Sequence, residues 1–395
     1  MTPSARIAAA IEILDRIGSG APAEKALTNW ARASRFAGSG DRAAIRDHVF
    51  TALRCWRSHA ALGGAETGRG RMLGQLREAG QDPEAFFTGA THSPAPLTEA
   101  EHAHLGADVA MPQAVALDCP DWLMPALEAS LGADFEPVMA ALRHRAPVWL
   151  RVNALRADRD GALASLTADG IVARPHPNVK MALEVTENER KIRNSSAYRD
   201  GLVELQDLAS QAVVDLLPVP SEGRILDYCA GGGGKALALA ARAPGAAIDA
   251  HDADPARMVD LPARAARAAA SIRPIEPGTA NRHGPYDVVL CDVPCSGSGA
   301  WRRSPEAKWR LNPEGLERLL DAQRGILAEA AALVAPGGRL AYVTCSLLDA
   351  ENSKQIQTFT SQYSAWEQLL AQRFLPTQEG DGFYCCVLTR VGHGS

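Results

Sequence analysis

Three features are missing from this 395-residue sequence, and each absence excludes a class of protein. No stretch approaches the roughly eighteen uninterrupted apolar residues of a transmembrane helix, so no membrane span is expected. The N-terminus carries Glu12 and Asp15 within its apolar stretch, which is typical of an amphipathic helix and not of a secretion signal. No two cysteines have CxxC spacing and no histidine lies at a matching interval, so no metal is expected.

A chain without an export signal is expected in the cytoplasm, where thiols stay reduced. Its eight cysteines are therefore expected to be free thiols or catalytic groups and not disulfides. A free cysteine usually behaves as a small buried hydrophobic residue. Cys55, Cys119, Cys291 and Cys386 are interpreted in that way. For Cys229, which lies in a glycine turn, packing and a place in a binding site remain open.

The net charge of −5, with a pI near 6.1, argues against binding nucleic acid through bulk charge. Basic residues are nevertheless clustered. Residues 1–80 hold twelve Lys and Arg against seven Asp and Glu, although solvated helix faces explain this excess equally well. A second basic cluster consists of Arg302, Arg303, Lys308 and Arg310. Such local patches can bind phosphate groups even on an acidic chain.

Changes in the pattern of apolar residues divide the chain into three parts. Apolar residues at three- and four-residue spacing predict an α-helical domain over residues 1–115. Residues 116–200 combine helical and alternating segments and predict a small α+β part. Residues 201–395 alternate strands with helices, which predicts an α/β domain with a doubly wound, mostly parallel sheet. A monomer is expected.

A glycine-rich turn follows the first strand of the third part, where the sequence from Cys229 to Lys235 is CAGGGGK. Glycines let the backbone approach a ligand and turn sharply into a helix. Asp252 ends the next strand, where a carboxylate can accept hydrogen bonds from ribose hydroxyls. The turn matches neither GxGxxG nor the phosphate loop, because Ala236 follows the lysine. S-adenosylmethionine is therefore favoured over NAD and ATP, with a turn that binds no ligand left as the alternative.

Two later strands are each followed by a cysteine. Cys295 lies in DVPCSGSG after the strand YDVVLC, and Cys345 lies in TCS after the strand RLAYV. Ligands of a doubly wound sheet bind outside the carboxyl ends of its strands. Because these strands are consecutive, we expect them to be neighbours in the sheet. Both thiols and Asp292 should then line one pocket beside the glycine turn.

Two thiols and a carboxylate suit methylation of a pyrimidine carbon. Carbon 5 of cytosine is a poor nucleophile, but a thiolate that adds to carbon 6 makes carbon 5 enamine-like. A carboxylic acid on N3 would stabilise the developing charge, and a second thiol could assist release. A Cys–His hydrolase is an alternative, although neither His251 nor His283 lies in a motif that places it against a cysteine.

These segments resemble the Fmu/Sun (RsmB-type) family of RNA cytosine-5 methyltransferases from about Pro120 to the C-terminus. The resemblance is carried by RVNALR (151–156), LVELQDLASQ (202–211), ILDYCAGGGGK, PCSGSG, TCS and DGFY, in the family's order and spacing. The segment 40–54 is similar to the NusB-like RNA-binding domain of the same proteins. The resemblance implies a Rossmann-like class I methyltransferase domain after a small α+β RNA-binding subdomain and an α-helical NusB-like domain.

The resemblance also implies the role of each matching residue. Cys345 matches the nucleophile, Cys295 the cysteine needed for product release, and Asp292 the residue that contacts both the cofactor and the cytosine. The residues matching the S-adenosylmethionine site are Cys229, Ala230, Gly231, Gly232, Gly233, Gly234, Lys235, Asp252 and Asp292. The implied reaction is methyl transfer to carbon 5 of a cytosine in RNA, with 16S ribosomal RNA favoured over transfer RNA.

Departures from the family pattern motivate a second hypothesis. The usual loop is CAAPGGKT, so Gly232 replaces a proline and Ala236 lacks a hydroxyl group. Thr279 or Ala280 stands where an acidic residue near the adenine is usual. The chain could therefore also be a non-catalytic RNA-binding assembly factor on a methyltransferase scaffold.

Overall fold

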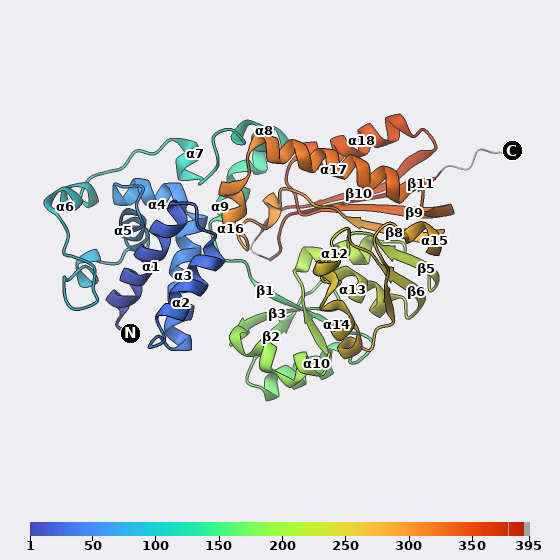
Figure 1. Ribbon diagram of the computed structural model, residues 1–395, viewed down its shortest axis with the longest axis horizontal. Helices are drawn as coiled ribbons and strands as arrows, with labels where there is room; N and C mark the ends of the chain where they lie inside the picture. The colour runs from blue at the N-terminus through green and yellow to red at the C-terminus, as the bar shows by residue number, and fades with distance from the viewer. Residues whose placement is uncertain (378, 391–395) are drawn as a thin grey trace. The chain divides into compact units, whose positions relative to one another are not determined.

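The computed structural model describes residues 1–377 and 379–390 (Figure 1). The chain forms two compact units. Unit 1 contains Met1–Arg145 and Trp301–Arg310, and unit 2 contains Ala146–Ala300 and Leu311–Ser395. Residues 116–145 therefore belong to the same compact unit as the N-terminal helices. The three-part division made from the sequence stays a proposal about function.

Unit 1 is built from helices around one apolar core. Thr2 caps α1 by accepting from the Ala5 backbone N–H, and the three- and four-residue spacing of α1 places Ile7 and Leu14 in that core. None of the described helices combines the length and the apolar character that a membrane crossing requires. The helices are α1 (Pro3–Gly18), α2 (Ala23–Ala33), α3 (Ser39–Arg54), α4 (Trp56–Gly63), α5 (Gly68–Glu78), α6 (Glu99–Leu105), α7 (Gln113–Ala116), α8 (Met124–Leu131), α9 (Phe135–Leu142) and α16 (Pro305–Arg310), with short 3₁₀ turns at Pro83–Ala85 and Gly132–Asp134.

The segment 301–310 packs against the C-terminal end of α3. Trp309 Nε1 donates to the Leu53 carbonyl at 2.7 Å, and Lys308 Nζ donates to the Arg54 carbonyl at 3.2 Å. Arg302 is 2% exposed and Lys308 is 1% exposed. The prediction of a phosphate-binding basic cluster is therefore wrong for these two residues, since both are buried and the Lys308 ammonium faces a helix terminus that favours positive charge.

The N-terminal part of unit 2 is a four-stranded antiparallel sheet in the order β2-β3-β1-β4. Its strands are β1 (Val148–Val152), β2 (Val172–Pro175), β3 (Ala182–Glu187) and β4 (Val203–Leu205). Alternate residues such as Leu150 and Val152 point into a core completed by Leu166 of α10 (Arg159–Ala168). The 3₁₀ helix Glu189–Asn194 and α11 (Ser196–Arg199) lead into β4.

A seven-stranded sheet in the order β10-β11-β9-β8-β5-β6-β7 forms the rest of unit 2. The strands β9, β8, β5, β6 and β7 run parallel, and β11 and β10 run antiparallel at one edge. The predicted α/β class is confirmed, as is the adjacency of the two cysteine-bearing strands. The strands are β5 (Glu222–Asp227), β6 (Gly245–Ala250), β7 (Ile272–Pro274), β8 (Tyr286–Asp292), β9 (Val334–Thr344), β10 (Trp366–Phe374) and β11 (Phe383–Arg390).

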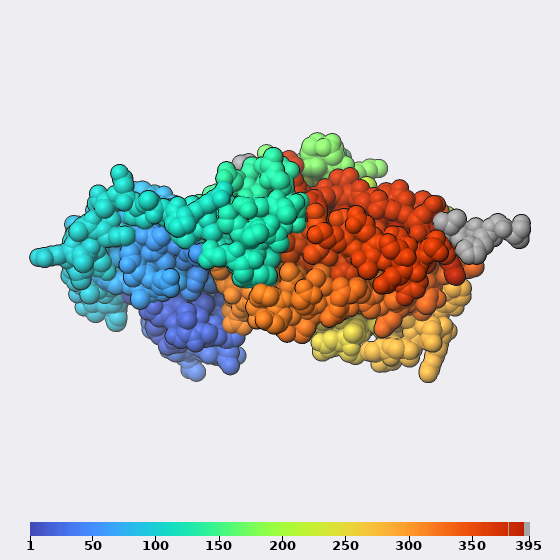
Figure 2. Space-filling model, turned by 90° about the horizontal axis from the view of Figure 1, so that it is seen from above, coloured from blue at the N-terminus to red at the C-terminus, as the bar shows by residue number. Residues whose placement is uncertain are grey.

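Helices cover both faces of this sheet, which explains why the inner parts of its central strands, such as Ile225–Leu226 and Val288–Cys291, are apolar at consecutive positions. Val288 and Leu290 pack under one set of helices, whereas Val289 and Cys291 pack under the other. Figure 2 shows α17 (orange) and α18 (red) side by side on one face. The covering helices are α12 (Leu208–Leu216), α13 (Gly234–Arg242) and α14 (Leu261–Ala268) on one face, and α17 (Pro313–Ala331) and α18 (Ser353–Gln362) on the other, while α15 (Ala280–His283) precedes β8.

Candidate active site

The glycine turn connects Asp227, the last residue of β5, to the start of α13. Gly231 and Gly233 have φ values of 51° and 79°, in the left-handed region that favours glycine. A Cβ atom on Gly233 would lie 2.2 Å from Leu261 Cδ1. The turn therefore needs glycine for its conformation and also because α14 lies so close.

Asp252, two residues beyond the end of β6, holds the glycine turn in place. Its buried carboxylate accepts a hydrogen bond from the Gly231 backbone N–H at 2.8 Å and another from the Asp254 backbone N–H at 3.0 Å. The half-exposed Arg257 lies 3.1 Å away, so ribose hydroxyls would share this carboxylate with a surface guanidinium. The sequence did not indicate the arginine, because its contact depends on the 3₁₀ turn Pro255–Met258.

Asp227 is a further polar group at this site, and it was not among the residues predicted from the sequence. It is 1% exposed, and neither carboxylate oxygen has a hydrogen-bond partner among the described residues. Burial, reinforced by the charge of Asp292, raises the pKa of Asp227 to about 7. A buried carboxylate without a partner at the end of β5 fits a cationic ligand such as S-adenosylmethionine, which carries a sulfonium and an ammonium group.

Lys235, in the first turn of α13, donates from Nζ to Asp292 Oδ2 at 2.6 Å. Burial opposes the lysine's charge, but the Asp292 carboxylate outweighs burial and raises the pKa of Lys235. The ammonium also lies 5.2 Å from the centre of the Phe383 ring. The glycine turn and the carboxyl end of β8 are therefore joined by a buried ion pair.

The two predicted cysteines lie at the ends of β8 and β9, which run parallel with Asp292 beside Val343. Their Sγ atoms are 3.5 Å apart, and both side chains are partly exposed. The hydrogen bond with Cys345, together with burial, raises the pKa of Cys295 well above its usual value. The two thiols are therefore close enough to exchange a proton.

Glu351, in the 3₁₀ helix Asp349–Glu351, holds the loops of both cysteines. Its fully buried carboxylate accepts from the Ser296 backbone N–H at 2.8 Å and from the hydroxyls of Ser296 and Ser346. Gln323 of α17 donates to the same carboxylate at 3.0 Å. Because Ser296 and Ser346 directly follow the two cysteines, one carboxylate fixes the spacing of the two sulfur atoms.

A second contact brings the cysteine loops and the C-terminal DGFY segment together. The Gly299 backbone N–H donates to the Cys345 carbonyl at 2.9 Å, and the Gly382 N–H donates to the Gly299 carbonyl at 2.9 Å. A Cβ atom on Gly299 would lie 2.2 Å from the Gly382 carbonyl oxygen. Gly299 of PCSGSG and Gly382 of DGFY are thus explained by the close approach of three backbone segments.

Replacing Glu351 by alanine is expected to lower the free energy of unfolding by about 3 kcal/mol, because it leaves buried donors unsatisfied. Urea unfolding of the full chain measures the change. Glu367→Ala is the matched control, since Glu367 is exposed on β10. Equal unfolding midpoints for the two variants would contradict the role assigned to the Glu351 carboxylate.

The histidine required by a Cys–His hydrolase is engaged elsewhere. His251 Nδ1 lies 2.7 Å from the Tyr228 carbonyl oxygen, and its ring stacks on the Tyr228 ring with centroids 4.5 Å apart. Cys229 packs against the apolar core on the α17 face, and burial raises its pKa. All eight cysteines are free thiols, and Cys55, Cys119, Cys291 and Cys386 are buried as predicted.

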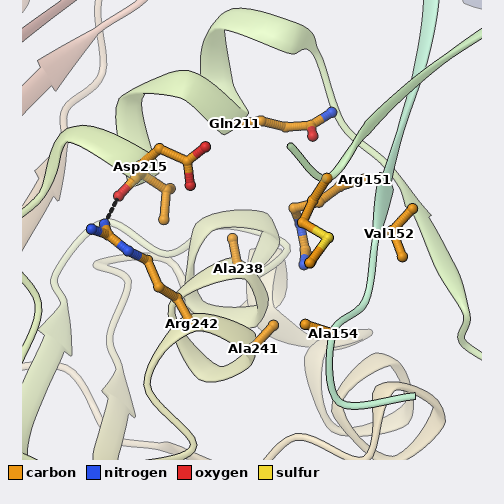
Figure 3. A pocket seen from close by; sticks show the side chains of 10 residues that line it. Arg151, Val152, Ala154, Gln211, Asp215, Ala238, Ala241 and Arg242 are labelled. Atoms are coloured by element: carbon orange, nitrogen blue, oxygen red, sulfur yellow. Dashed lines mark hydrogen bonds between the residues drawn. The ribbon is translucent and has the colours of Figure 1, made fainter. Parts of the chain in front are cut away.

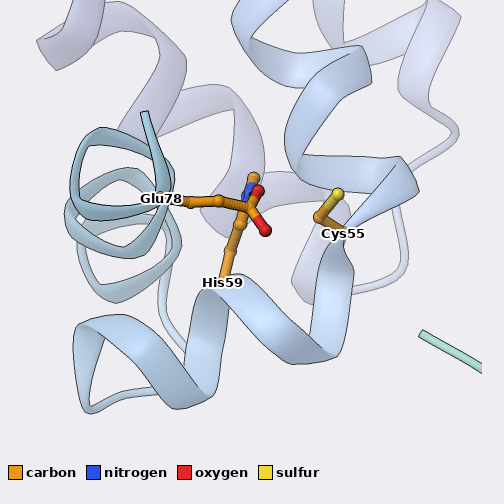
Figure 4. A group of neighbouring side chains, drawn as sticks. All are labelled: Cys55, His59 and Glu78. Atoms are coloured by element: carbon orange, nitrogen blue, oxygen red, sulfur yellow. The ribbon is translucent and has the colours of Figure 1, made fainter. Parts of the chain in front are cut away.

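One group in unit 1 has donors suited to a metal ion (Figure 4). Ligand atoms of Cys55, His59 and Glu78 lie within 4.8 Å of one another. Arg143 already pairs with Glu78, and burial raises the pKa of Cys55 to about 12. A protonated thiol and a neighbouring guanidinium oppose a cation, so we interpret this group as a buried hydrogen-bond network.

The strand order, the glycine turn at the end of β5 and the site at the neighbouring strand ends define the fold of this chain as that of the class of methyltransferases that use S-adenosylmethionine. The solved structure of PH0851 has the same fold, with a TM-score of 0.74 at 22% identity, covering 98% of this chain and 99% of that one.

More particularly, the chain belongs to the RsmB/F family. The family described as 16S rRNA methyltransferase RsmB/F matches residues 214–389, and the RsmF/B-like ferredoxin-like domain matches residues 119–191. A curated relative from Xylella fastidiosa strain 9a5c, ribosomal RNA small subunit methyltransferase B, is 34% identical over 287 residues, which cover 67% of each chain. The enzyme of that name from Serratia proteamaculans is 30% identical, and the match covers 69% of this chain and just under two thirds, 66%, of that protein.

Proposed function

We propose that this protein transfers a methyl group from S-adenosylmethionine to carbon 5 of a cytosine in 16S ribosomal RNA, in the cytoplasm. The observation that carries the proposal is the pair of sulfur atoms 3.5 Å apart beside the glycine turn. Membership of the RsmB/F family supports the ribosomal substrate, and 16S rRNA is part of that family's description. Methyl transfer to carbon 5 by this route needs both thiols.

Cys345 is the nucleophile in this mechanism. Its thiolate adds to carbon 6 of the cytosine, and carbon 5 then has the electron density needed to accept a methyl group. S-adenosylmethionine, when bound, supplies that methyl group on a positively charged sulfur. The assignment of attack to Cys345 comes from the family resemblance, and the nearby Lys235 ammonium would stabilise negative charge on its sulfur.

Asp292 and Lys235 form the polar side of the pocket. Asp292 lies at the end of β8, where its carboxyl group can reach N3 of the ring, and Lys235 holds it at 2.6 Å. A preorganised hydrogen bond of this kind stabilises charge that develops on the ring. Cys295 then acts in release: after its own proton passes to solvent, its thiolate takes the proton from carbon 5, and the bond between Cys345 and carbon 6 breaks to return the Cys345 thiolate.

The test of the proposed function is incubation of the protein with methyl-labelled S-adenosylmethionine and unmodified 16S rRNA. Label should appear in 5-methylcytosine after digestion to nucleosides. Absence of transfer would overturn the proposal, and calorimetry would then decide whether the chain still binds S-adenosylmethionine. Bisulfite sequencing of RNA from cells lacking the protein would identify the modified nucleotide.

A further inference from the structure

A cavity of about 140 Å³ lies in unit 2 between the four-stranded sheet and the helices α12 and α13 (Figure 3). It is separate from the two cysteines, which do not line it. Six of its ten lining residues are apolar: Val152, Ala154, Met181, Val214, Ala238 and Ala241. A cavity of roughly this size holds one small aromatic ring system, so it fits a planar ligand better than a hydrated ion.

Arg151 of β1 places an unpaired charge at this cavity. The residue is 6% exposed, and within the described part of the chain its side chain donates one hydrogen bond, from Nε to Gln206 Oε1 at 2.7 Å. Its two terminal nitrogens therefore have no hydrogen-bond partner among residues 1–377 and 379–390. The nearby Glu204 is already paired with Arg264 and Arg267. A buried guanidinium without a carboxylate is costly, and an acceptor-bearing ligand in the cavity would remove that cost.

Acceptors line the same cavity from α12. Gln211 is 3% exposed, and its Oε1 has no donor within the described residues, while its Nε2 donates to the Gln206 carbonyl. Asp215, an exposed residue, lies across the cavity from Arg151 in Figure 3. Burial raises the pKa of Asp215. A phosphate ion would meet this carboxylate and an apolar lining, so a ligand with both acceptors and donors is favoured.

We propose that this cavity binds a guanine base of the RNA substrate. Guanine offers two adjacent acceptors, O6 and N7, to the arginine fork, and its N1–H and N2–H₂ groups can donate to Gln211 and Asp215. Adenine has its N6–H₂ donor at the position where the Arg151 guanidinium needs an acceptor. Uracil and cytosine each have one donor group, whereas Gln211 and Asp215 can accept from two. An unstacked base in an apolar slot is a common way for proteins to read single-stranded RNA.

The cavity is connected to the proposed reaction site through Gln206. Gln206 accepts from Arg151 and donates from Nε2 to the Gly234 carbonyl at 3.4 Å, where α13 begins. The same helix contributes Ala238 to the cavity and Lys235 to the ion pair with Asp292. A bound base would therefore pack against α13, the helix that begins at the proposed cofactor-binding turn.

The test uses the full chain with isotope-labelled methionine methyl groups and guanosine 5′-monophosphate as the probe. Met181 lines the cavity and is one of seven methionines, so its NMR signal, assigned with Met181→Leu, reports occupancy. At up to about 10 mM nucleotide, guanosine monophosphate should shift this signal, and adenosine monophosphate should bind at least about tenfold more weakly.

Arg151→Met and Arg151→Lys should each weaken binding of guanosine monophosphate by about tenfold or more, because the lysine retains charge but lacks the fork. Arg174→Met is the matched control, an exposed arginine of β2 in the same sheet. Unchanged binding in a folded Arg151 variant, no shift of the wild-type Met181 signal, or equal binding of adenosine monophosphate would overturn the proposal.

The assignment of the bound base to RNA rests on the proposed function, and a separate measurement tests it. Arg151→Lys should raise the KM for 16S rRNA by about tenfold in the methylation assay. A normal KM together with binding of guanosine monophosphate would overturn the RNA assignment in favour of a free nucleotide. If wild type methylated no RNA, the proposed function would fail, whereas the nucleotide measurement would still stand by itself.

Discussion

Cys345→Ala will reduce methyl transfer to 16S rRNA by a factor of about 10⁴ or more, because removing a covalent nucleophile removes the pathway it provides. Without addition to carbon 6, carbon 5 of cytosine stays a poor nucleophile whatever else the site contains. The loss should appear in kcat and not in the KM for S-adenosylmethionine, since Cys345 is not part of the glycine turn that is proposed to bind this cofactor. The measurement is the initial rate of label transfer at saturating S-adenosylmethionine and RNA.

The matched control is Cys385→Ala, which removes a fully buried thiol from β11, the strand next to β9. This variant should lose stability from the small cavity it creates and keep its rate of methyl transfer. Transfer by Cys345→Ala at the wild-type rate would show that the reaction proceeds without a covalent adduct at this cysteine.

Cys295→Ser will trap a covalent complex between the protein and RNA. Attack by Cys345 stays possible in this variant, but the thiol that lies 3.5 Å away and assists release is gone. A serine hydroxyl is a far weaker acid than a thiol, so it cannot take over the exchange of a proton. The complex should be visible as a band of reduced mobility on a denaturing gel with labelled RNA.

The double variant Cys295→Ser/Cys345→Ala is the control for this experiment, because it lacks the attacking sulfur. It should give no shifted band under the same conditions. A band of equal intensity in the double variant would assign the crosslink to another residue, and no band in Cys295→Ser would remove the release role from Cys295.

Several parts of the fold followed from local pattern. The apolar runs around Ile225 and Val289 predicted buried parallel strands, because a strand covered on both faces can be apolar at consecutive positions. The strand β10 was not predicted, since its exposed residues alternate poorly and it is defined by pairing with β11. Edge strands depend more on their partner than on their own sequence.

The basic cluster shows the limit of reading charge from sequence. Lys308 and Arg302 have the composition of a phosphate-binding patch, yet both are buried in unit 1. The Lys308 ammonium donates to the backbone at the end of α3, and the Arg302 carbonyl accepts from the Arg54 side chain. Burial lowers the pKa of Lys308 to about 8. Whether a lysine faces solvent or a helix terminus is decided by contacts between residues some 250 positions apart, such as Lys308 with Arg54.

The sequence by itself determined the family, the strand-and-turn framework and the placement of two cysteines after consecutive strands. These depend on short-range periodicity and on motifs whose order along the chain is fixed. Only the tertiary structure decided that a single carboxylate, Glu351, holds both cysteine loops, that Asp227 is left without a partner and that Arg151 faces a cavity unpaired. Hydrogen-bond satisfaction of a buried group depends on every element packed around it, and no local pattern records that environment.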